Sequence, residues 1–193
     1  MIDQLNASLA LITSQTQMNI DILAVILAVL WFVFLLSSID KRLLTLGIIP
    51  RHVRGIPGIL LAPLLHANFN HIFFNSIPLV VLSNFLLIKG IHYYLLTTLA
   101  ITLGSGLLIW CFAKPGLHVG ASAVITGYWA LLISDIFKQG TLTAIILGVL
   151  SLYYFAGIFL GVFPGKKGVS WQGHLFGLLS GFAFSYLAIA AFP

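Results

Sequence analysis

Gly120-Ala121-Ser122-Ala123 leads into the apolar run Val-Ile-Thr-Gly-Tyr-Trp-Ala-Leu-Leu-Ile, which covers positions 124–133. This composition predicts a helix in an apolar medium that begins near Ser122. A hydroxyl at the start of a helix usually accepts hydrogen bonds from free N–H groups of the first turn. A second polar residue, His174, also stands near the start of an apolar helix, where an imidazole is costly without a partner. Together the two residues make Ser122 a candidate nucleophile as well as a candidate helix cap.

The composition places the chain among membrane proteins. Of its 193 residues, 60% are hydrophobic and 7% are charged, and the mean hydropathy is +1.11. The N-terminus lacks the pattern of a removable signal peptide, so we expect the first apolar helix to direct insertion. The single cysteine, Cys111, excludes an intrachain disulfide. The net charge of +5 comes from Lys and Arg spread over short loops, which indicates contact with a membrane surface and not with nucleic acid.

The apolar stretches predict an all-α, polytopic membrane protein with one six-span domain, residues 19–193, after a short N-terminal tail, residues 1–18. Most stretches are long enough to cross about 30 Å of hydrocarbon at about 1.5 Å per residue. An even number of spans places both termini on the same side. The predicted spans are residues 20–38, 68–88, 93–113, 122–137, 142–163 and 174–192.

Two further patterns concern how these spans are joined and packed. The connection 39–65 mixes arginines, prolines and apolar patches, which indicates a loop lying partly in the membrane interface. In the sixth span, Gly173, Gly177 and Gly181 recur every four residues on one helical face. This spacing favours a close approach to a neighbouring helix.

The second predicted span begins with an unusual group of polar residues. His71 and Asn75 are four apart and therefore share one helical face. His66 is five residues before His71, so we expect it to point elsewhere and to brace the adjoining loop. Polar residues within a membrane usually mark a site, and two strong donors on one face of an apolar helix predict one here.

A serine and an imidazole can act as a nucleophile and its general base. The His71 and Asn75 side chains, with the backbone N–H of Ser122, are suitable donors to an oxyanion. An acidic third member is missing, because Asp135 lies 13 residues after Ser122, about 20 Å along the helix. The sequence therefore predicts a Ser122–His174 dyad. The chain has only four carboxylates: Asp3, Asp21, Asp40 and Asp135.

Metal binding and solute transport are two other functions that these histidines could serve. His66 and His71 are poorly spaced for chelation from one helix, and no Cys, Asp or Glu stands near them in sequence, so we expect no metal and no cofactor. A transporter lined by these polar groups stays an alternative, although the chain lacks the inverted repeats and paired broken helices typical of that class.

These motifs resemble the rhomboid family of intramembrane serine proteases in order, spacing and span number. The resemblance extends from about residue 20 to the end of the chain. It rests on three motifs: His66-x4-His71-x3-Asn75, Gly120-x-Ser122 and Gly173-His174-x2-Gly177.

The resemblance implies a role for each of these residues. Ser122 is the nucleophile and His174 the base, while His71, Asn75 and the Ser122 backbone form the oxyanion hole. The loop 164–172 forms a mobile cap, and the fifth span forms a lateral gate for substrate. The residues expected to support the site are His66, Gly120, Thr126 and Gly177.

The resemblance also implies a substrate class and a location. The expected substrates are single-span membrane proteins, cut within or beside a membrane helix that unwinds readily and carries small side chains at the cut. The expected partners are therefore the lipid bilayer and such proteins. The expected location is the inner membrane of a bacterium.

The chain departs from the family pattern at two positions. The family usually has glycine after the serine, where this chain has Ala123, and an aromatic residue four positions after it, where this chain has Thr126. We expect the Thr126 hydroxyl, one helical turn from Ser122, to hydrogen-bond the His174 imidazole. These departures leave open a proteolytically inactive rhomboid-like protein that binds membrane helices for quality control.

The family resemblance and the distribution of basic residues give conflicting predictions of the orientation in the membrane. The resemblance places both termini in the cytoplasm and opens the Ser122 site to the outside. With that orientation, seven basic residues lie in outer loops and two, Lys89 and Lys138, lie on the inner side, which reverses the usual positive-inside distribution. The seven are Lys41, Arg42, Arg51, Arg54, Lys114, Lys166 and Lys167.

Overall fold

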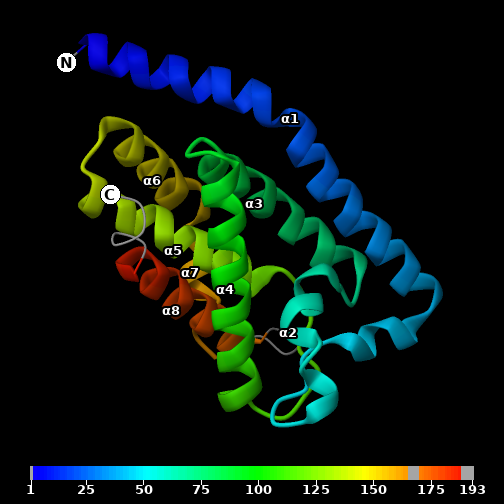
Figure 1. Ribbon diagram of the computed structural model, residues 1–193. Helices are drawn as coiled ribbons and strands as arrows, with labels where there is room; N and C mark the ends of the chain where they lie inside the picture. The colour runs from blue at the N-terminus through cyan, green and yellow to red at the C-terminus, as the bar shows by residue number, and fades with distance from the viewer. Residues whose placement is uncertain (1, 165–169, 188–193) are drawn as a thin grey trace.

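The apolar stretches form helices that pack side by side (Figure 1). The computed structural model describes residues 2–164 and 170–187, and over these residues its regular structure is helical apart from one isolated β-bridge. The predicted all-α class is therefore confirmed. The longer helices are α1 (Ile2–Ile39), α3 (Phe69–Leu87), α4 (Ile91–Phe112), α5 (Ser122–Gln139), α6 (Leu142–Phe155) and α8 (Trp171–Leu187).

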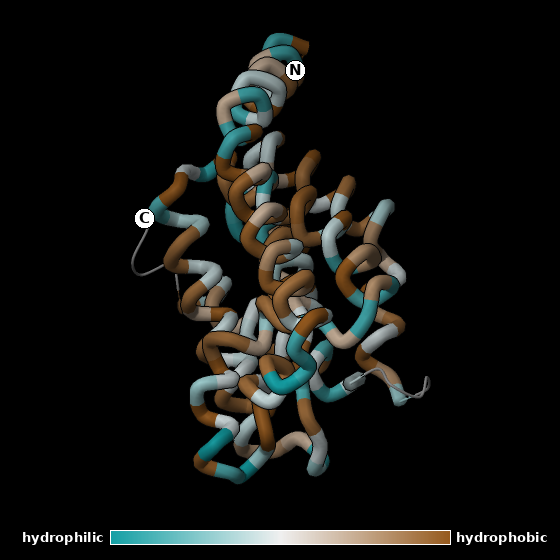
Figure 2. The backbone as a smooth tube through the Cα atoms, turned by 90° about the vertical axis from the view of Figure 1, so that its right-hand side faces the viewer, coloured by the Kyte–Doolittle hydropathy of each residue, from teal (hydrophilic) through white to brown (hydrophobic). Residues whose placement is uncertain are grey.

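Three of these helices are long and apolar enough to cross a membrane: α1, α3 and α4. The predicted second and third spans match α3 and α4 to within two residues at each end. α6 is apolar but shorter, with 14 residues, and α5 and α8 contain 18 and 17. Figure 2 shows the hydrophobic residues concentrated along the helices, with hydrophilic residues more frequent at the two ends of the molecule.

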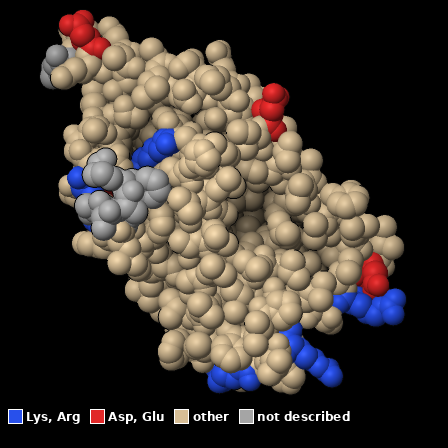
Figure 3. Space-filling model, in the orientation of Figure 1, with Lys and Arg blue, Asp and Glu red and all other residues tan. Residues whose placement is uncertain are grey.

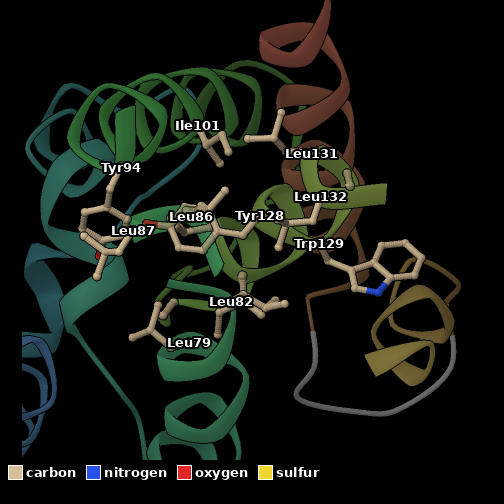
Figure 4. Packing of buried hydrophobic residues seen from close by; sticks show 14 of the residues in the cluster. Leu79, Leu82, Leu86, Leu87, Tyr94, Ile101, Tyr128, Trp129, Leu131 and Leu132 are labelled. Carbon is tan, nitrogen blue, oxygen red and sulfur yellow. The ribbon is translucent and has the colours of Figure 1, made fainter. Parts of the chain in front are cut away.

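The helix that carries Ser122 lies at the centre of the bundle. α5 packs against α3, α4, α6 and α8, and its side chains are buried along most of its length. Figure 4 shows Tyr128 of α5 among leucines of α3 and near Tyr94 of α4, whereas Trp129 points to the other side, where its Nε1 donates to the Ser151 carbonyl of α6 at 3.1 Å. Because other helices surround it, α5 does not need a continuous apolar surface toward lipid, and it tolerates Asp135 and Lys138 near its C-terminus.

Glycines allow α8 to lie directly against α5. A Cβ atom added at Gly177 would be 2.0 Å from the Ala123 carbonyl oxygen, and one at Gly181 would be 2.2 Å from that of Gly127. The backbones therefore touch at two successive turns, as the four-residue spacing predicts. Because residue numbers rise together along both helices, the contact is parallel and brings their N-termini to the same end.

α1 is much longer than a single membrane crossing. Its 38 residues extend about 57 Å, and residues 2–18, the predicted tail, form its first half. Buried polar contacts hold this half: Asn84 of α3 donates to Thr16 (2.8 Å) and accepts from Asn19 (3.1 Å). Thr143 of α6 donates to Ser8 at 3.1 Å. The first half of α1 thus lies over the ends of α3 and α6 that are remote from Ser122 (Figure 1).

The connection 39–65 folds into short helical turns beside the start of α5. Ile48 and His118 exchange backbone hydrogen bonds of 3.0 and 2.9 Å, and the Arg51 guanidinium donates to the free carbonyls of Cys111 and Ala113 at the end of α4. Basic side chains gather at the lower end of the molecule in Figure 3, where this connection lies. Its turns are η1 (Lys41–Leu46), η2 (Val53–Gly55), α2 (Gly58–Leu61) and η3 (Ala62–Leu64).

The last two spans differ from their predicted bounds. The expected helix 142–163 is interrupted after Phe155 and continues as α7 (Gly157–Leu160). Glycines at 157 and 161 explain the interruption, because glycine favours the helix less than other residues except proline. α8 begins at Trp171, three residues earlier than predicted, because Ser170 caps it. Residues 165–169 of the predicted cap loop and residues 188–192 of the predicted sixth span lie outside the described residues.

Candidate active site

Ser122 is the first residue of α5, and the backbone before it is closely surrounded. The Gly120 N–H donates to the Ala62 carbonyl at 2.8 Å. Gly120 has φ +114°, and a Cβ atom there would be 2.4 Å from Nε2 of His71. Position 120 therefore requires glycine both for its backbone conformation and for contact with His71.

His71 and Asn75 approach Gly120 from α3. Asn68 caps this helix, and its side-chain oxygen accepts from the His71 N–H at 2.9 Å. Asn75 lies one turn further along, with Nδ2 3.5 Å from the position of an added Cβ at Gly120. The predicted pair on one helical face therefore lies beside the chain segment that leads into Ser122.

His174 reaches the same region from α8. Its Nδ1 lies 3.1 Å from the Ser170 carbonyl oxygen, and because a carbonyl only accepts, Nδ1 carries the proton and Nε2 is available as a base. The parallel contact of Gly177 with Ala123 leaves Ser122 and His174 about 3 Å apart along the bundle axis. Within the described residues Ser122 makes no direct hydrogen bond to His174.

His66 joins the elements around Ser122. Its Nε2 accepts from Asn75 Nδ2 at 3.1 Å and from the Ala121 N–H at 3.4 Å, while Nδ1 lies 3.4 Å from the Leu64 carbonyl. Burial, together with the neighbouring His71, lowers the pKa of His66 to about 4, so the ring is neutral near pH 7. A neutral ring with its proton on Nδ1 makes all three bonds.

Two predicted orientations were wrong. His66 does not point away from His71: their ring centroids are 4.9 Å apart, because His66 lies in the loop before α3 and the helical spacing does not apply to it. The buried Thr126 hydroxyl donates to the Ser122 carbonyl at 2.7 Å instead of bonding to His174. A threonine inside a helix commonly makes this bond to the residue four positions earlier.

A small cavity opens beside Ser122 on the side of α2 and α4. Its wall includes the polar residues Ser122, His118 and Ser170 together with Gly120, Ile59 and Ile109. His71, Asn75 and His174 are not part of this wall.

Two residues that the sequence reasoning did not single out also belong to this region. His118 Nδ1 is 2.9 Å from the Ser170 hydroxyl, and both residues line the cavity. The sequence carries a signal for them, because His118 precedes Ser122 by four residues and Ser170 precedes His174 by four. Asp135, in contrast, pairs with Lys89 at the far end of α5.

Comparison with known proteins identifies the family of the chain. Residues 54–191 match the rhomboid domain. An uncharacterized protein of Mycobacterium bovis is 37% identical over 175 residues, which cover 84% of this chain and 72% of the relative, and one of Mycobacterium tuberculosis has the same values. An uncharacterized protein of Mycobacterium leprae is 36% identical over 143 residues, covering 69% of this chain and 56% of the relative. The chain therefore belongs to the rhomboid family, whose members are integral membrane proteins.

Proposed function

We propose that this protein is an intramembrane serine endopeptidase with Ser122 as nucleophile and His174 as general base. The observation that carries the proposal is the placement of His174. Its Nδ1 proton is held by the Ser170 carbonyl, and backbone contact between α5 and α8 brings the ring to the level of Ser122. A base with its other nitrogen occupied in this way has one nitrogen available for the serine proton.

The reaction follows from these roles. His174 Nε2 takes the Ser122 hydroxyl proton as Oγ bonds to the scissile carbonyl carbon, giving a tetrahedral oxyanion. The protonated imidazole then gives this proton to the leaving amine, and an acyl-enzyme remains. Water, deprotonated by the same nitrogen, hydrolyses the ester and restores Ser122.

The proposed oxyanion donors are the Ser122 backbone N–H and the His71 and Asn75 side chains. An amide has two N–H donors, and Asn75 uses one on His66 Nε2. The second is available to the developing charge. His66 thereby fixes the amide in place, and such preorganised donors contribute strongly to acyl transfer.

We propose that the substrates are single-span membrane proteins and that the chain has six spans in a bacterial inner membrane. A helical substrate has its carbonyls engaged in hydrogen bonds, so a segment must unwind before Ser122 attacks it. The narrow cavity beside Ser122 favours small side chains near the cut.

The second candidate is a rhomboid-like protein that binds membrane helices without cutting them. The observations in its favour are Thr126 in place of an aromatic residue and the missing hydrogen bond between Ser122 and His174 among the described residues. Both candidates use the same bundle and differ only in whether Ser122 is activated.

Labelling of the purified protein with a fluorophosphonate separates the two candidates, because the probe reacts with an activated serine without a known substrate. The protease proposal expects labelling of the wild type and none of Ser122→Ala or His174→Ala. Loss of labelling in both variants is expected because members of a catalytic unit fail together. A wild type that stays unlabelled favours the binding protein.

A further inference from the structure

His118 and Ser170 form a hydrogen-bonded bridge between the two segments that carry Ser122 and His174. His118 Nε2 is 3.1 Å from the Lys114 carbonyl, and because a carbonyl only accepts, Nε2 carries the proton. In the neutral ring Nδ1 is then an acceptor, and the Ser170 hydroxyl donates to it at 2.9 Å. The direction of both bonds is thus fixed.

Ser170 uses its remaining atoms to hold the first turn of α8. Its hydroxyl oxygen accepts from the Gly173 N–H at 3.2 Å, as an N-cap does. Its carbonyl accepts from His174 Nδ1 at 3.1 Å. One residue therefore caps the helix, orients the His174 ring and contacts His118.

His118 is itself held firmly. Its backbone N–H and carbonyl are paired with those of Ile48 at 2.9 and 3.0 Å, and the side chain is half-buried in the wall of the cavity. A second link between the same segments runs from the Lys114 N–H to the Gln172 side chain at 2.8 Å, but it does not involve Ser170.

We infer that His118 is a positioning residue for the reaction: through Ser170 it fixes the His174 ring relative to Ser122. The inference rests on the proposed protease function. The glycine contacts between α5 and α8 begin at Gly177, one turn beyond His174. The first turn of α8 is held by its Ser170 cap and by the link from Gln172 to Lys114, and of these two only Ser170 bonds the His174 ring. The bridge through Ser170 therefore performs a task that in other serine hydrolases belongs to a carboxylate.

Three substitutions at His118 distinguish positioning of the His174 ring from general stabilisation of the loop before Ser122. His118→Asn keeps an acceptor near the position of Nδ1, His118→Gln keeps a polar group near that of Nε2, and His118→Leu keeps neither. We expect the rate constant of fluorophosphonate labelling to fall about threefold to tenfold in the Leu and Gln variants, the size of one lost hydrogen bond, and about twofold or less in the Asn variant. Gln172→Ala is the matched control and is expected to label at the wild-type rate.

A double-mutant cycle tests the connection through Ser170. The bridge passes through the Ser170 hydroxyl. The double variant with His118→Leu and Ser170→Ala is therefore expected to be labelled no more slowly than Ser170→Ala alone. The melting temperatures of the same four proteins are expected to show the same coupling. This readout does not depend on activity.

The outcomes distinguish failure of this inference from failure of the proposed function. If the wild type is labelled and His118→Leu is labelled equally fast, the inference is wrong and the protease proposal stands. Additive losses in the cycle, for rate and for melting temperature, also overturn the inference. A wild type that is never labelled overturns the protease function and the positioning role with it.

Discussion

At the scale of single residues, the sequence identifies the members of the site better than their partners. Ser122, His174, His71 and Asn75 stand out because polar groups are costly in apolar helices. His71 and Asn75 lie beside Gly120, two residues before Ser122, and the catalytic roles of all four stay predictions. The partners of His66 and Thr126 were not predictable from spacing. His66 lies in a loop, and the Thr126 hydroxyl has a nearer acceptor in its own helix.

The role of Asn75 gives the first prediction. Asn75→Ala is expected to lower kcat about a hundredfold with little change in KM, because it removes a donor that acts on the transition state. Asn84→Ala is the control on the same helix: it breaks the contacts with Thr16 and Asn19 and is expected to lower the melting temperature without changing kcat. If Asn75→Ala loses stability and keeps a normal kcat, Asn75 is only structural.

Thr126 gives a second prediction at this scale. Its side chain is completely buried, so Thr126→Phe is expected to destabilise the protein by about 1–3 kcal/mol through overpacking. Thr126→Val loses one hydrogen bond and is expected to cost about 1 kcal/mol and to keep its activity. Thermal unfolding with labelling measures both variants. A valine variant that is stable yet inactive would instead indicate a hydroxyl contact with His174.

The buried histidine predicts a pH dependence. The pKa of His66 is about 4 in the folded protein and 6.5 when exposed, so between these values the unfolded chain binds a proton that the folded protein does not. The stabilisation that this neutral ring contributes is complete above pH 6.5 and is lost as the pH falls toward 4. The melting temperature of His66→Gln is therefore expected to decline less with acidification than that of the wild type. If the two melting temperatures decline equally on acidification, His66 is not responsible for the pH dependence of stability.

At the scale of helices, hydropathy predicted best the bounds of those helices that are followed by a lysine and a helix-breaking residue. α3 and α4 end two residues before Lys89-Gly90 and Lys114-Pro115, and their bounds were predicted closely. The break after Phe155 was missed, because glycines at 157 and 161 weaken a helix without making it less apolar. The early start of α1 was missed because its polar residues bond to other helices: Ser8 accepts from Thr143 of α6, and Thr16 accepts from Asn84 of α3.

The contact between α5 and α8 predicts that alanine destabilises the protein at Gly177 but not at a glycine outside this contact. Gly177→Ala places a methyl group against the Ala123 backbone, which cannot move away as a side chain does. We expect a loss of about 1–3 kcal/mol of stability together with slower labelling, because α8 carries His174. Gly157→Ala is the control, since an added Cβ there meets nothing within 4 Å. Equal stability of the two variants would contradict the close packing.

At the scale of the whole molecule, Ser122 lies at one end of the bundle with most of the basic residues. Lys89 and Lys138 lie near the opposite end, where α3 and α5 finish. Charge counting therefore places the active-site end in the cytoplasm, whereas the family resemblance places it outside. Four of the basic residues belong to the connection that folds against α4 and the start of α5. We propose that these four contact lipid headgroups and therefore have little effect on insertion.

We predict cytoplasmic termini, with Ser122 opening to the outside. Reporters fused after Pro193 measure this directly: one that is active only in the cytoplasm is expected to be active, and a periplasmic one silent. The reverse pattern would show that charge sets the orientation.

Cleavage in proteoliposomes tests the central claim, that Ser122 and His174 act as a catalytic dyad within the membrane. The purified protein is reconstituted with a single-span reporter that carries small residues and glycines in its membrane helix, and the product masses locate the cut. We predict one cut within or beside that helix by the wild type and none by Ser122→Ala or His174→Ala, both folded as judged by melting temperature. Cleavage that persists in Ser122→Ala would contradict the account.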